Sequence, residues 1–185
     1  MNRVATGSGK ERMSAPLRLD QSKLQAARHD LNEGAVTPGA GAWREEIVAL
    51  LGGALATELV CMLRYRRHYF MANGLASPHV AEEFLAHANE ELGHADRIAE
   101  RIAQLGGEPD FRPDSLAARS LADYDDAADL TAMIKADLAA ERVAIEAYRQ
   151  MIALVADKDP TTRTLLEGIL ANEEEHAEDL RVLIA

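Results

Sequence analysis

The chain has 185 residues and a net charge of −11, with 48% hydrophobic and only 4% aromatic residues. Ala and Leu are abundant and runs of β-branched residues are scarce, so the composition favours helices in one domain with a substantial core. The single cysteine, Cys61, excludes an intramolecular disulfide framework, a zinc ribbon and a rubredoxin-type iron site.

A signal peptide and a transmembrane helix each contain a characteristic apolar segment, and the sequence has no segment of either kind. No apolar leader follows the basic residues near the N-terminus, and no later segment approaches eighteen uninterrupted apolar residues. We therefore expect a soluble, cytoplasmic protein without a membrane partner. The acidic balance also argues against general DNA affinity of the body of the protein.

The first 41 residues are rich in Gly, Ser, Pro and isolated charges, and they end in the breaker cluster 37–41. This pattern predicts a flexible, basic N-terminal arm with at most one short helix, followed by a folded body over residues 42–185. Residues 1–28 carry six basic and two acidic side chains, a net of +4, which leaves −15 for the remainder. Such an arm is either a solubilising tail or a DNA contact.

The first long helix is expected from Trp43 to Ala72. Its apolar stripe contains one carboxylate, Glu58, and Tyr65 follows seven residues later. A second apolar patch on the opposite face would be exposed in a monomer, and we predict that it forms the dimer interface of a homo-oligomer. The patch consists of Val60, Leu63 and Phe70.

The second helix is expected to start at Ser77-Pro78, with an N-cap and a proline at the first helical position, and to stop at Gly106-Gly107. The short connection at Asn73-Gly74 makes the first two helices antiparallel neighbours. Glu91 and His94 form a Glu-x-x-His unit on its apolar face, where i and i+3 side chains project to the same side.

A linker over residues 108–126 is long enough to cross the length of a bundle. The third helix, expected to end near Ala156, again places one carboxylate, Glu141, in its apolar stripe, with Tyr148 seven residues later. The fourth helix starts after Asp159-Pro160 and carries the second Glu-x-x-His unit, Glu173 and His176.

The two halves of the body repeat each other. The lone and paired glutamates are separated by 33 residues in the first half and 32 in the second. The sequence therefore predicts an all-α, four-helix bundle made of two antiparallel hairpins joined by a long crossover.

One glutamate from each of two helices and a Glu-x-x-His unit from each of the other two is the ligand pattern of di-iron and di-manganese carboxylate bundles. Four carboxylates balance two divalent cations, and carboxylates with imidazoles suit iron or manganese. The predicted metal ligands are Glu58, Glu91, His94, Glu141, Glu173 and His176.

Four further polar residues lie on the same faces. His87, one turn before Glu91, is either a support or alternative ligand of the site or a hydrogen-bonded histidine at the bundle edge. Asp137 either orients a ligating imidazole or is a polar boundary residue. Tyr65 and Tyr148 either donate electrons or hydrogen bonds to the site or are ordinary core aromatics.

On these motifs, roughly residues 43–185 resemble the ferritin-like superfamily, and within it bacterioferritin. The resemblance implies a ferroxidase that oxidises two Fe(II) ions with dioxygen or hydrogen peroxide and stores Fe(III) inside a hollow oligomer. It also implies that Glu91 and Glu173 bridge the ions, that Glu58 and Glu141 are terminal ligands, and that Tyr65 lies beside the site.

The resemblance is incomplete at two places. Leu92 stands where bacterioferritin has its haem-binding methionine, so we expect no haem, and only nine residues follow His176, where the family has a fifth helix. Two alternative functions stay open: a di-metal oxidase, peroxidase or hydroxylase without storage, and an iron-oxidising, DNA-associated protein similar to Dps that uses the basic arm.

Overall fold

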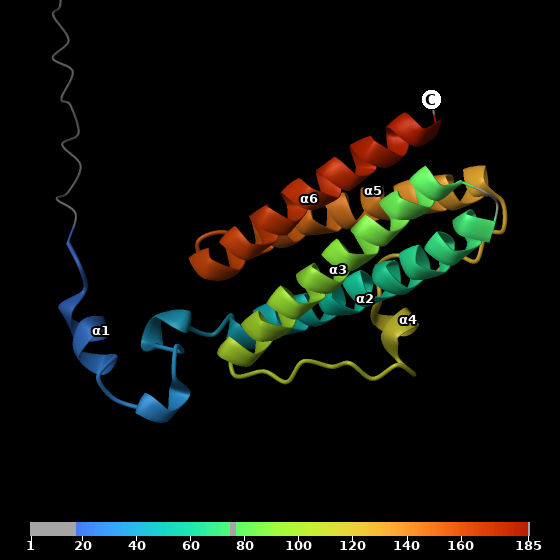
Figure 1. Ribbon diagram of the computed structural model, residues 1–185. Coiled ribbons are helices and arrows are strands. Elements are labelled where there is room, and N and C mark those ends of the chain that lie inside the picture. The colour runs from blue at the N-terminus through green and yellow to red at the C-terminus, as the bar shows by residue number, and fades with distance from the viewer. Residues whose placement is uncertain (1–17, 75–76, 185) are drawn as a thin grey trace, which may run out of the picture.

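The structure is a computed structural model and describes residues 18–74 and 77–184. Four long helices, α2, α3, α5 and α6, lie side by side in a bundle (Figure 1), and the described residues contain no strand. The predicted all-α four-helix bundle is confirmed. The bundle helices are α2 (Arg44–Gly74), α3 (Pro78–Gln104), α5 (Leu130–Val155) and α6 (Pro160–Ile184).

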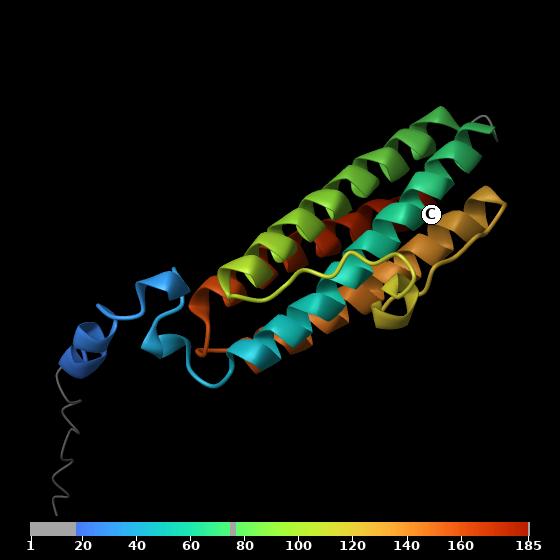
Figure 2. The same ribbon diagram turned by 90° about the horizontal axis from the view of Figure 1, so that it is seen from below.

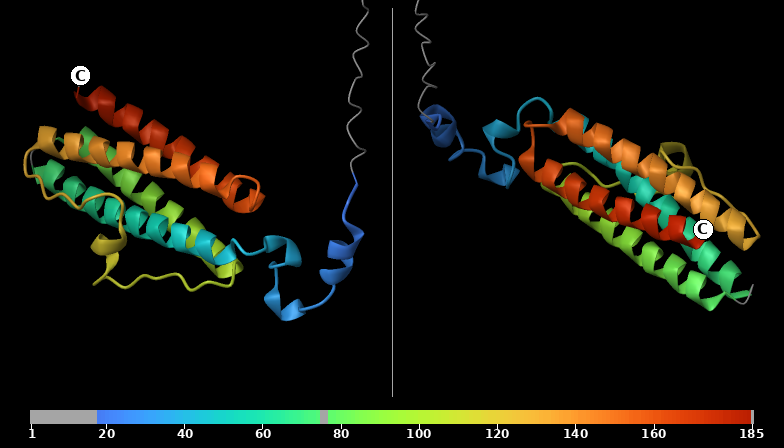
Figure 3. Two further views of the ribbon diagram at one scale, coloured as in Figure 1. Left: turned by 180° about the vertical axis from the view of Figure 1, so that it is seen from behind. Right: turned by 90° about the horizontal axis from the view of Figure 1, so that it is seen from above.

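The bundle consists of two antiparallel hairpins, α2 with α3 and α5 with α6, and the further views show the same pairing (Figure 3). The crossover between them contains α4 (Leu116–Arg119) and runs along α2 (Figure 2). It is fixed there because Leu121 N donates to Thr57 Oγ1 at 2.9 Å and Arg67 donates to the carbonyl of Ala127 at 2.7 Å.

The path of the crossover corrects the predicted interface on α2. Val60 is only 3% exposed, because the crossover lies over this face of the helix, whereas Leu63 and Phe70 remain 46% and 69% exposed. The expectation that a monomer exposes the whole patch was therefore wrong for Val60. The interface itself stays a prediction, now resting on Leu63 and Phe70.

Local signals set most helix ends. Asp159 caps α6 by accepting from the backbone N–H of Thr162 at 3.0 Å, and α3 ends just before Gly106, whose φ of 75° suits glycine. Ser77, in contrast, makes no side-chain cap hydrogen bond, so only the proline at the start of α3 behaves as expected.

Two apolar clusters fill the bundle on either side of a polar layer. One cluster includes Leu51, Leu55 and Ile98, and the other includes Phe84, Met133 and Leu180. Burial of such side chains contributes roughly 25 cal/mol per Å² of apolar surface, which makes these clusters the main source of stability. They hold the polar layer at a fixed depth in the bundle.

Within the described residues, one segment, Arg44–Ala72 of α2, is long and apolar enough to cross a membrane by length and composition. More than half of its apolar window is buried inside the bundle, and it carries Glu58 and Arg64 in the core. The core helix of a bundle has the same composition, so this finding adds little support for a membrane span.

The described part of the N-terminal segment contains α1 (Gln21–Ala26) and two short 3-10 helices, η1 (Leu31–Glu33) and η2 (Pro38–Ala40). An ion pair of 3.1 Å between Arg44 and Glu33 joins it to the start of α2. Three of the six basic residues of the predicted arm lie outside the described residues: Arg3, Lys10 and Arg12. The division into an arm of residues 1–41 and a body of 42–185 stays a prediction.

Candidate dinuclear metal centre

The polar layer of the bundle contains all six predicted metal ligands. Each long helix presents its ligands inward because they fall on its apolar stripe, and each ligand residue is at most 2% exposed. The six residues are Glu58 on α2, Glu91 and His94 on α3, Glu141 on α5, and Glu173 and His176 on α6.

The first ligand group surrounds the imidazole of His94. Its Nδ1 lies 3.0 Å from Glu58 Oε2, 2.9 Å from Glu173 Oε1 and 3.6 Å from Glu91 Oε2. Ligand atoms that bind one ion at about 2.0–2.2 Å are at most about 4.0–4.4 Å apart, so these atoms can share a cation. The first group is thus compatible with one metal ion.

The second ligand group surrounds His176 in the same way. Its Nδ1 lies 3.6 Å from Glu91 Oε1, 3.6 Å from Glu173 Oε2 and 4.0 Å from Glu141 Oε2. Glu91 and Glu173 therefore belong to both groups, and each offers a different oxygen to each imidazole. This sharing is what two neighbouring ions bridged by two carboxylates require.

The hydrogen bonds in this layer show whether the residues fit metal ions. Several buried atoms of the candidate ligands have no hydrogen-bond partner. Glu91 Oε1, Glu141 Oε2 and His176 Nδ1 are all unpartnered. Unpaired buried polar atoms cost free energy, and two divalent cations would pair them and balance four carboxylates. The donor set of carboxylates and imidazoles suits iron or manganese.

Without metal, the imidazoles hold protons. Burial alone lowers the pKa of His94, but its hydrogen bonds to Glu173 and Glu58 outweigh burial and raise the pKa to about 11. Burial likewise disfavours protonated His176, and Glu173 and Glu141 raise its pKa to about 9.

Burial and neighbouring charges also shift the pKa values of the glutamates in this layer. Burial, together with the charges of neighbouring glutamates, raises the pKa values of Glu91 and Glu141 well above the usual range. Burial also raises the pKa of Glu173, but the neighbouring imidazoles of His176 and His94 give a net lowering. The metal-free layer therefore retains protons that two cations would replace.

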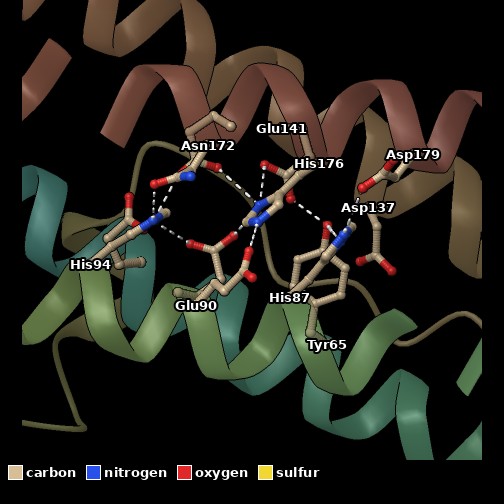
Figure 4. Close-up of polar contacts among 12 residues, drawn as sticks. Tyr65, His87, Glu90, His94, Asp137, Glu141, Asn172, His176 and Asp179 are labelled. Carbon is tan, nitrogen blue, oxygen red and sulfur yellow. Dashed lines mark hydrogen bonds and ion pairs between the residues drawn. The ribbon is translucent and has the colours of Figure 1, made fainter. Parts of the chain in front are cut away.

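The outer nitrogen of each ligating imidazole has its own polar partner. His94 Nε2 lies 3.3 Å from Asn172 Oδ1, and His176 Nε2 lies 2.6 Å from Glu90 Oε2 (Figure 4). An acceptor at Nε2 fixes the proton there and leaves Nδ1 free for the metal. Neither Glu90 nor Asn172 was predicted to be such a partner, although each directly precedes the glutamate of a Glu-x-x-His unit.

The two tyrosines lie in equivalent positions on opposite hairpins. Tyr65 on α2 donates a short hydrogen bond to Glu141 on α5, and Tyr148 on α5 donates one to Glu58 on α2. Burial, followed by the charge of the accepting glutamate, raises the pKa of both phenols well above their usual value, so both remain donors. Of the two interpretations of the tyrosines, these contacts favour hydrogen bonding to the site.

Of the two interpretations of Asp137, its contacts do not support the orientation of an imidazole of the ligand groups, because its carboxylate bonds other residues. Its carboxylate accepts from Arg64 Nε at 2.7 Å and lies 2.8 Å from His68 Nδ1, and all three side chains are fully buried. Neither Arg64 nor His68 was identified from the sequence. The crossover helps to hold Arg64, which also donates to the carbonyl of Asp123 at 3.0 Å, whereas the ring of His68 lies against Phe84 of α3.

His87 lies at the edge of the ligand layer. Its ring stacks on that of His176 with centroids 4.1 Å apart, and its Nδ1 lies 3.3 Å from the Tyr65 hydroxyl. Burial, and then the charge of His176, lowers the pKa of His87 to about 4. Leu92, at the position of the haem methionine, is 37% exposed on α3.

Comparison with known proteins identifies the family. Residues 48–185 match the family model of the ferritin-like domain. The chain belongs to this ferritin-like family. It is 32% identical over 136 residues to a bacterioferritin of Mycobacterium avium, which covers 73% of this chain and 81% of that protein. A nutrient stress-induced DNA-binding protein of Synechococcus sp. is 34% identical over 130 residues, 69% of this chain and 74% of the relative.

The ferritin-like chain is also similar to solved structures of a bacterioferritin and of a bacterioferritin-related protein. The bacterioferritin-related protein of Bacteroides fragilis, described as a dodecameric thioferritin, superposes with a TM-score of 0.71 at 32% identity, over 75% of this chain and 83% of that one. Rhodobacter capsulatus bacterioferritin, with a metal-free dinuclear site and haem iron, gives 0.67 at 25% identity, over 76% and 84%. The predicted resemblance to bacterioferritin is thereby confirmed.

Proposed function

We propose that this ferritin-like protein is a ferroxidase that oxidises Fe(II) for iron storage or detoxification. The observation that carries the proposal is the pair of overlapping ligand groups, each with one imidazole, that share Glu91 and Glu173. Two Fe(II) ions, as substrate, would occupy these groups. We further propose that the protein acts in the cytoplasm, where Fe(II) persists under reducing conditions.

The reaction balances with either oxidant. Two Fe(II) ions lose two electrons to become two Fe(III), and dioxygen takes up these electrons and two protons to give hydrogen peroxide. With hydrogen peroxide as oxidant, the same two electrons and two protons give two molecules of water. A pair of irons at neighbouring positions can deliver both electrons together.

The protein's own residues would hold and orient the ions. Glu58 and Glu141 would each bind one ion as terminal ligands, and the phenols that donate to them would hold the second oxygen of each carboxylate. The outer partners of the two imidazoles would keep Nδ1 aimed at the metal. The apolar clusters above and below would restrict solvent access.

Aerobic addition of Fe(II), followed by ferric absorbance, tests the proposal. The parent should accelerate oxidation over buffer, and Glu58→Ala and His94→Ala should remove most of that acceleration. Glu175→Gln is the matched control, because this exposed glutamate adjoins His176 and lies outside both ligand groups. Parent and ligand variants that oxidise iron at the same rate would contradict the proposal.

Storage requires a homo-oligomer with an interior, and the dodecameric relative supports that expectation for this chain. We propose that the assembly uses Leu63 and Phe70 and retains many irons per chain. Mass in solution and iron per chain after loading measure both properties. A stable monomer or dimer that retains no more than about two irons would instead favour a di-metal oxidase, peroxidase or hydroxylase without storage.

The similarity to a cyanobacterial DNA-binding protein favours one further candidate function. The basic N-terminal arm would bind DNA through its Lys and Arg side chains, and such binding weakens steeply with salt. Gel shifts of the full chain and of a variant lacking residues 1–40, at low and moderate salt, separate the outcomes. Equal binding with and without the arm, or none, would eliminate this role.

A further inference from the structure

A second acidic and histidine cluster lies at the edge of the dinuclear centre. His87 Nε2 is 3.4 Å from Glu83 Oε1 and 3.8 Å from Asp179 Oδ2, within the separation that ligands of one ion allow. The imidazole is only 3% exposed, but the side chains of Glu83 and Asp179 are 30% and 47% exposed. The cluster thus extends from two solvent-exposed carboxylates to the buried Nε2 of His87.

The hydrogen bonds of His87 leave its outer nitrogen without a partner. The Tyr65 hydroxyl donates its proton to Glu141, so its oxygen accepts from His87 Nδ1 (Figure 4). A neutral imidazole with its proton on Nδ1 presents a lone pair at Nε2. That buried atom has no hydrogen-bond partner and faces two carboxylates.

Three acceptors with no donor between them repel one another. The arrangement costs free energy unless a positive charge lies at their centre. One divalent cation would balance the two carboxylates and pair with the lone pair of Nε2.

The internal repeat shows that this cluster is specific to one half of the bundle. An offset of 82 residues relates Glu91 to Glu173, and the same offset relates Glu83 to Leu165 and His87 to Ile169. Ile169 is fully buried in an apolar cluster. An apolar residue therefore satisfies the packing at the equivalent position, so packing alone does not require His87.

We propose that Glu83, His87 and Asp179 form a third metal site, which binds one divalent transition-metal cation from solvent. Nε2 of His87 and one oxygen from each carboxylate are its protein ligands, and water completes the coordination.

The third site lies where it can hold a cation before that cation enters the dinuclear centre. This role as a staging point rests on the proposed iron oxidation. The ring of His87 stacks on that of His176, a ligand of the second group, and its Nδ1 contacts the phenol that bonds Glu141. A cation at the third site is therefore separated from the dinuclear centre by a single layer of side chains.

Equilibrium dialysis against Co(II), with metal analysis of the protein, tests the site without any redox step. The parent should bind about three ions per chain, and Glu83→Gln/Asp179→Asn should bind about two. Crystals soaked in Co(II) should show an anomalous peak beside His87 in the parent but not in Glu83→Gln/Asp179→Asn. His87 itself is left unchanged, because it contacts His176 and its substitution would disturb both sites.

Two control variants separate the third site from the dinuclear centre. Glu82→Gln/Glu178→Gln removes the same charge from exposed neighbours on the same two helices and should still bind about three ions. Glu58→Gln/His94→Gln alters the first ligand group and should lose ions while keeping the peak beside His87.

The outcomes are distinguishable. A parent that binds only two ions, or a Glu83→Gln/Asp179→Asn variant that keeps the third, would overturn the third site. A Glu58→Gln/His94→Gln variant that loses no ion would instead contradict the dinuclear centre. If both sites exist, loss of the third should raise the KM for Fe(II) several-fold in the oxidation assay while leaving kcat unchanged.

Discussion

The two imidazoles of the proposed metal centre differ in which group accepts a hydrogen bond from the outer nitrogen. A carboxylate, Glu90, accepts from His176, whereas an amide oxygen, that of Asn172, accepts from His94. A negative partner makes the imidazole a stronger donor to the metal than a neutral one does. Glu90 should therefore make the second ligand group bind its cation more tightly than a group whose histidine has a neutral partner.

Replacing Glu90 by Gln tests this difference. Loss of an outer partner typically weakens metal binding about 10–100-fold. We expect about 10-fold here, because the side chain of Glu90 is 55% exposed and the amide oxygen of Gln can still accept. Calorimetric titration with Co(II) measures the affinity, with Glu82→Gln on the same helix as the control. Unchanged affinity would show that the carboxylate is not needed.

Asp137 is predicted to be critical for stability rather than for iron oxidation. It compensates the buried guanidinium of Arg64, and both side chains are fully buried. Removing one partner of a buried ion pair costs about 3–5 kcal/mol, because the other charge is left unpaired. Denaturant unfolding of Asp137→Ala should show this loss, whereas Asp126→Ala, at an exposed position, should change stability by about 0.5 kcal/mol or less. Similar values for the two variants would contradict the prediction.

At the scale of helices, the hairpins repeat in their ligands but differ in what surrounds them. The polar residues near Tyr65 correspond to apolar ones near Tyr148: Arg64 to Ala147, His68 to Met151 and His87 to Ile169. The tyrosines pair with Glu141 and Glu58 across the repeat, yet among the residues that the structure describes only one side has a buried charge network and a second acidic cluster. The two proposed metal positions would therefore be chemically unequal.

Helical periodicity explains why the sequence could predict that these six side chains converge in the bundle. Carboxylates at Glu58 and Glu141 fall inside apolar stripes, and no solvated face explains them. The spacing within Glu91-x-x-His94 then places both side chains on one face. These relations lie within single helices, so no knowledge of how helices cross was needed.

The contacts that sequence reasoning missed depend on packing between elements. Val60 is buried and Arg64 is fixed because the crossover follows one particular path along α2, and periodicity does not set that path. Glu90 reaches His176 only because α3 and α6 cross at this height. The internal repeat did contain a signal, since Glu90 and Asn172 occupy equivalent positions.

The turn between α5 and α6 offers a test of backbone conformation. Ala156 has a φ of 44°, in the left-handed region, where a side chain costs about 1–2 kcal/mol and glycine does not. Ala156→Gly should therefore stabilise the protein by up to about 1 kcal/mol. The gain is smaller than the full cost of the alanine side chain, because glycine also increases the conformational entropy of the unfolded chain. Ala153→Gly, at an exposed position inside α5, should instead destabilise it by about 0.5–1 kcal/mol. Denaturant midpoints that shift in the same direction would refute the prediction.

For the whole molecule, the proposed ligand layer should make stability depend on metal and pH together. The folded, metal-free protein binds more protons than the unfolded chain, because its two ligating imidazoles and two of its glutamates have raised pKa values. Stability from a raised pKa is complete below the unfolded value and is lost as the pH rises through the folded value. For His94 this window runs from about pH 6.5 to about 11, and for His176 to about 9.

We therefore expect the melting temperature of the metal-free protein to fall by several degrees between pH 6.5 and pH 8.5. Metal has the opposite dependence, because ions bind the deprotonated ligands and release their protons, so the rise in melting temperature on adding Co(II) should be larger at pH 8.5. Calorimetry at both pH values, with and without Co(II), measures both trends. His94→Gln/His176→Gln, which lacks the two titrating imidazoles, should show a flatter pH dependence. A metal-free parent that becomes more stable at pH 8.5 would contradict the assignment of these protons to the ligand layer.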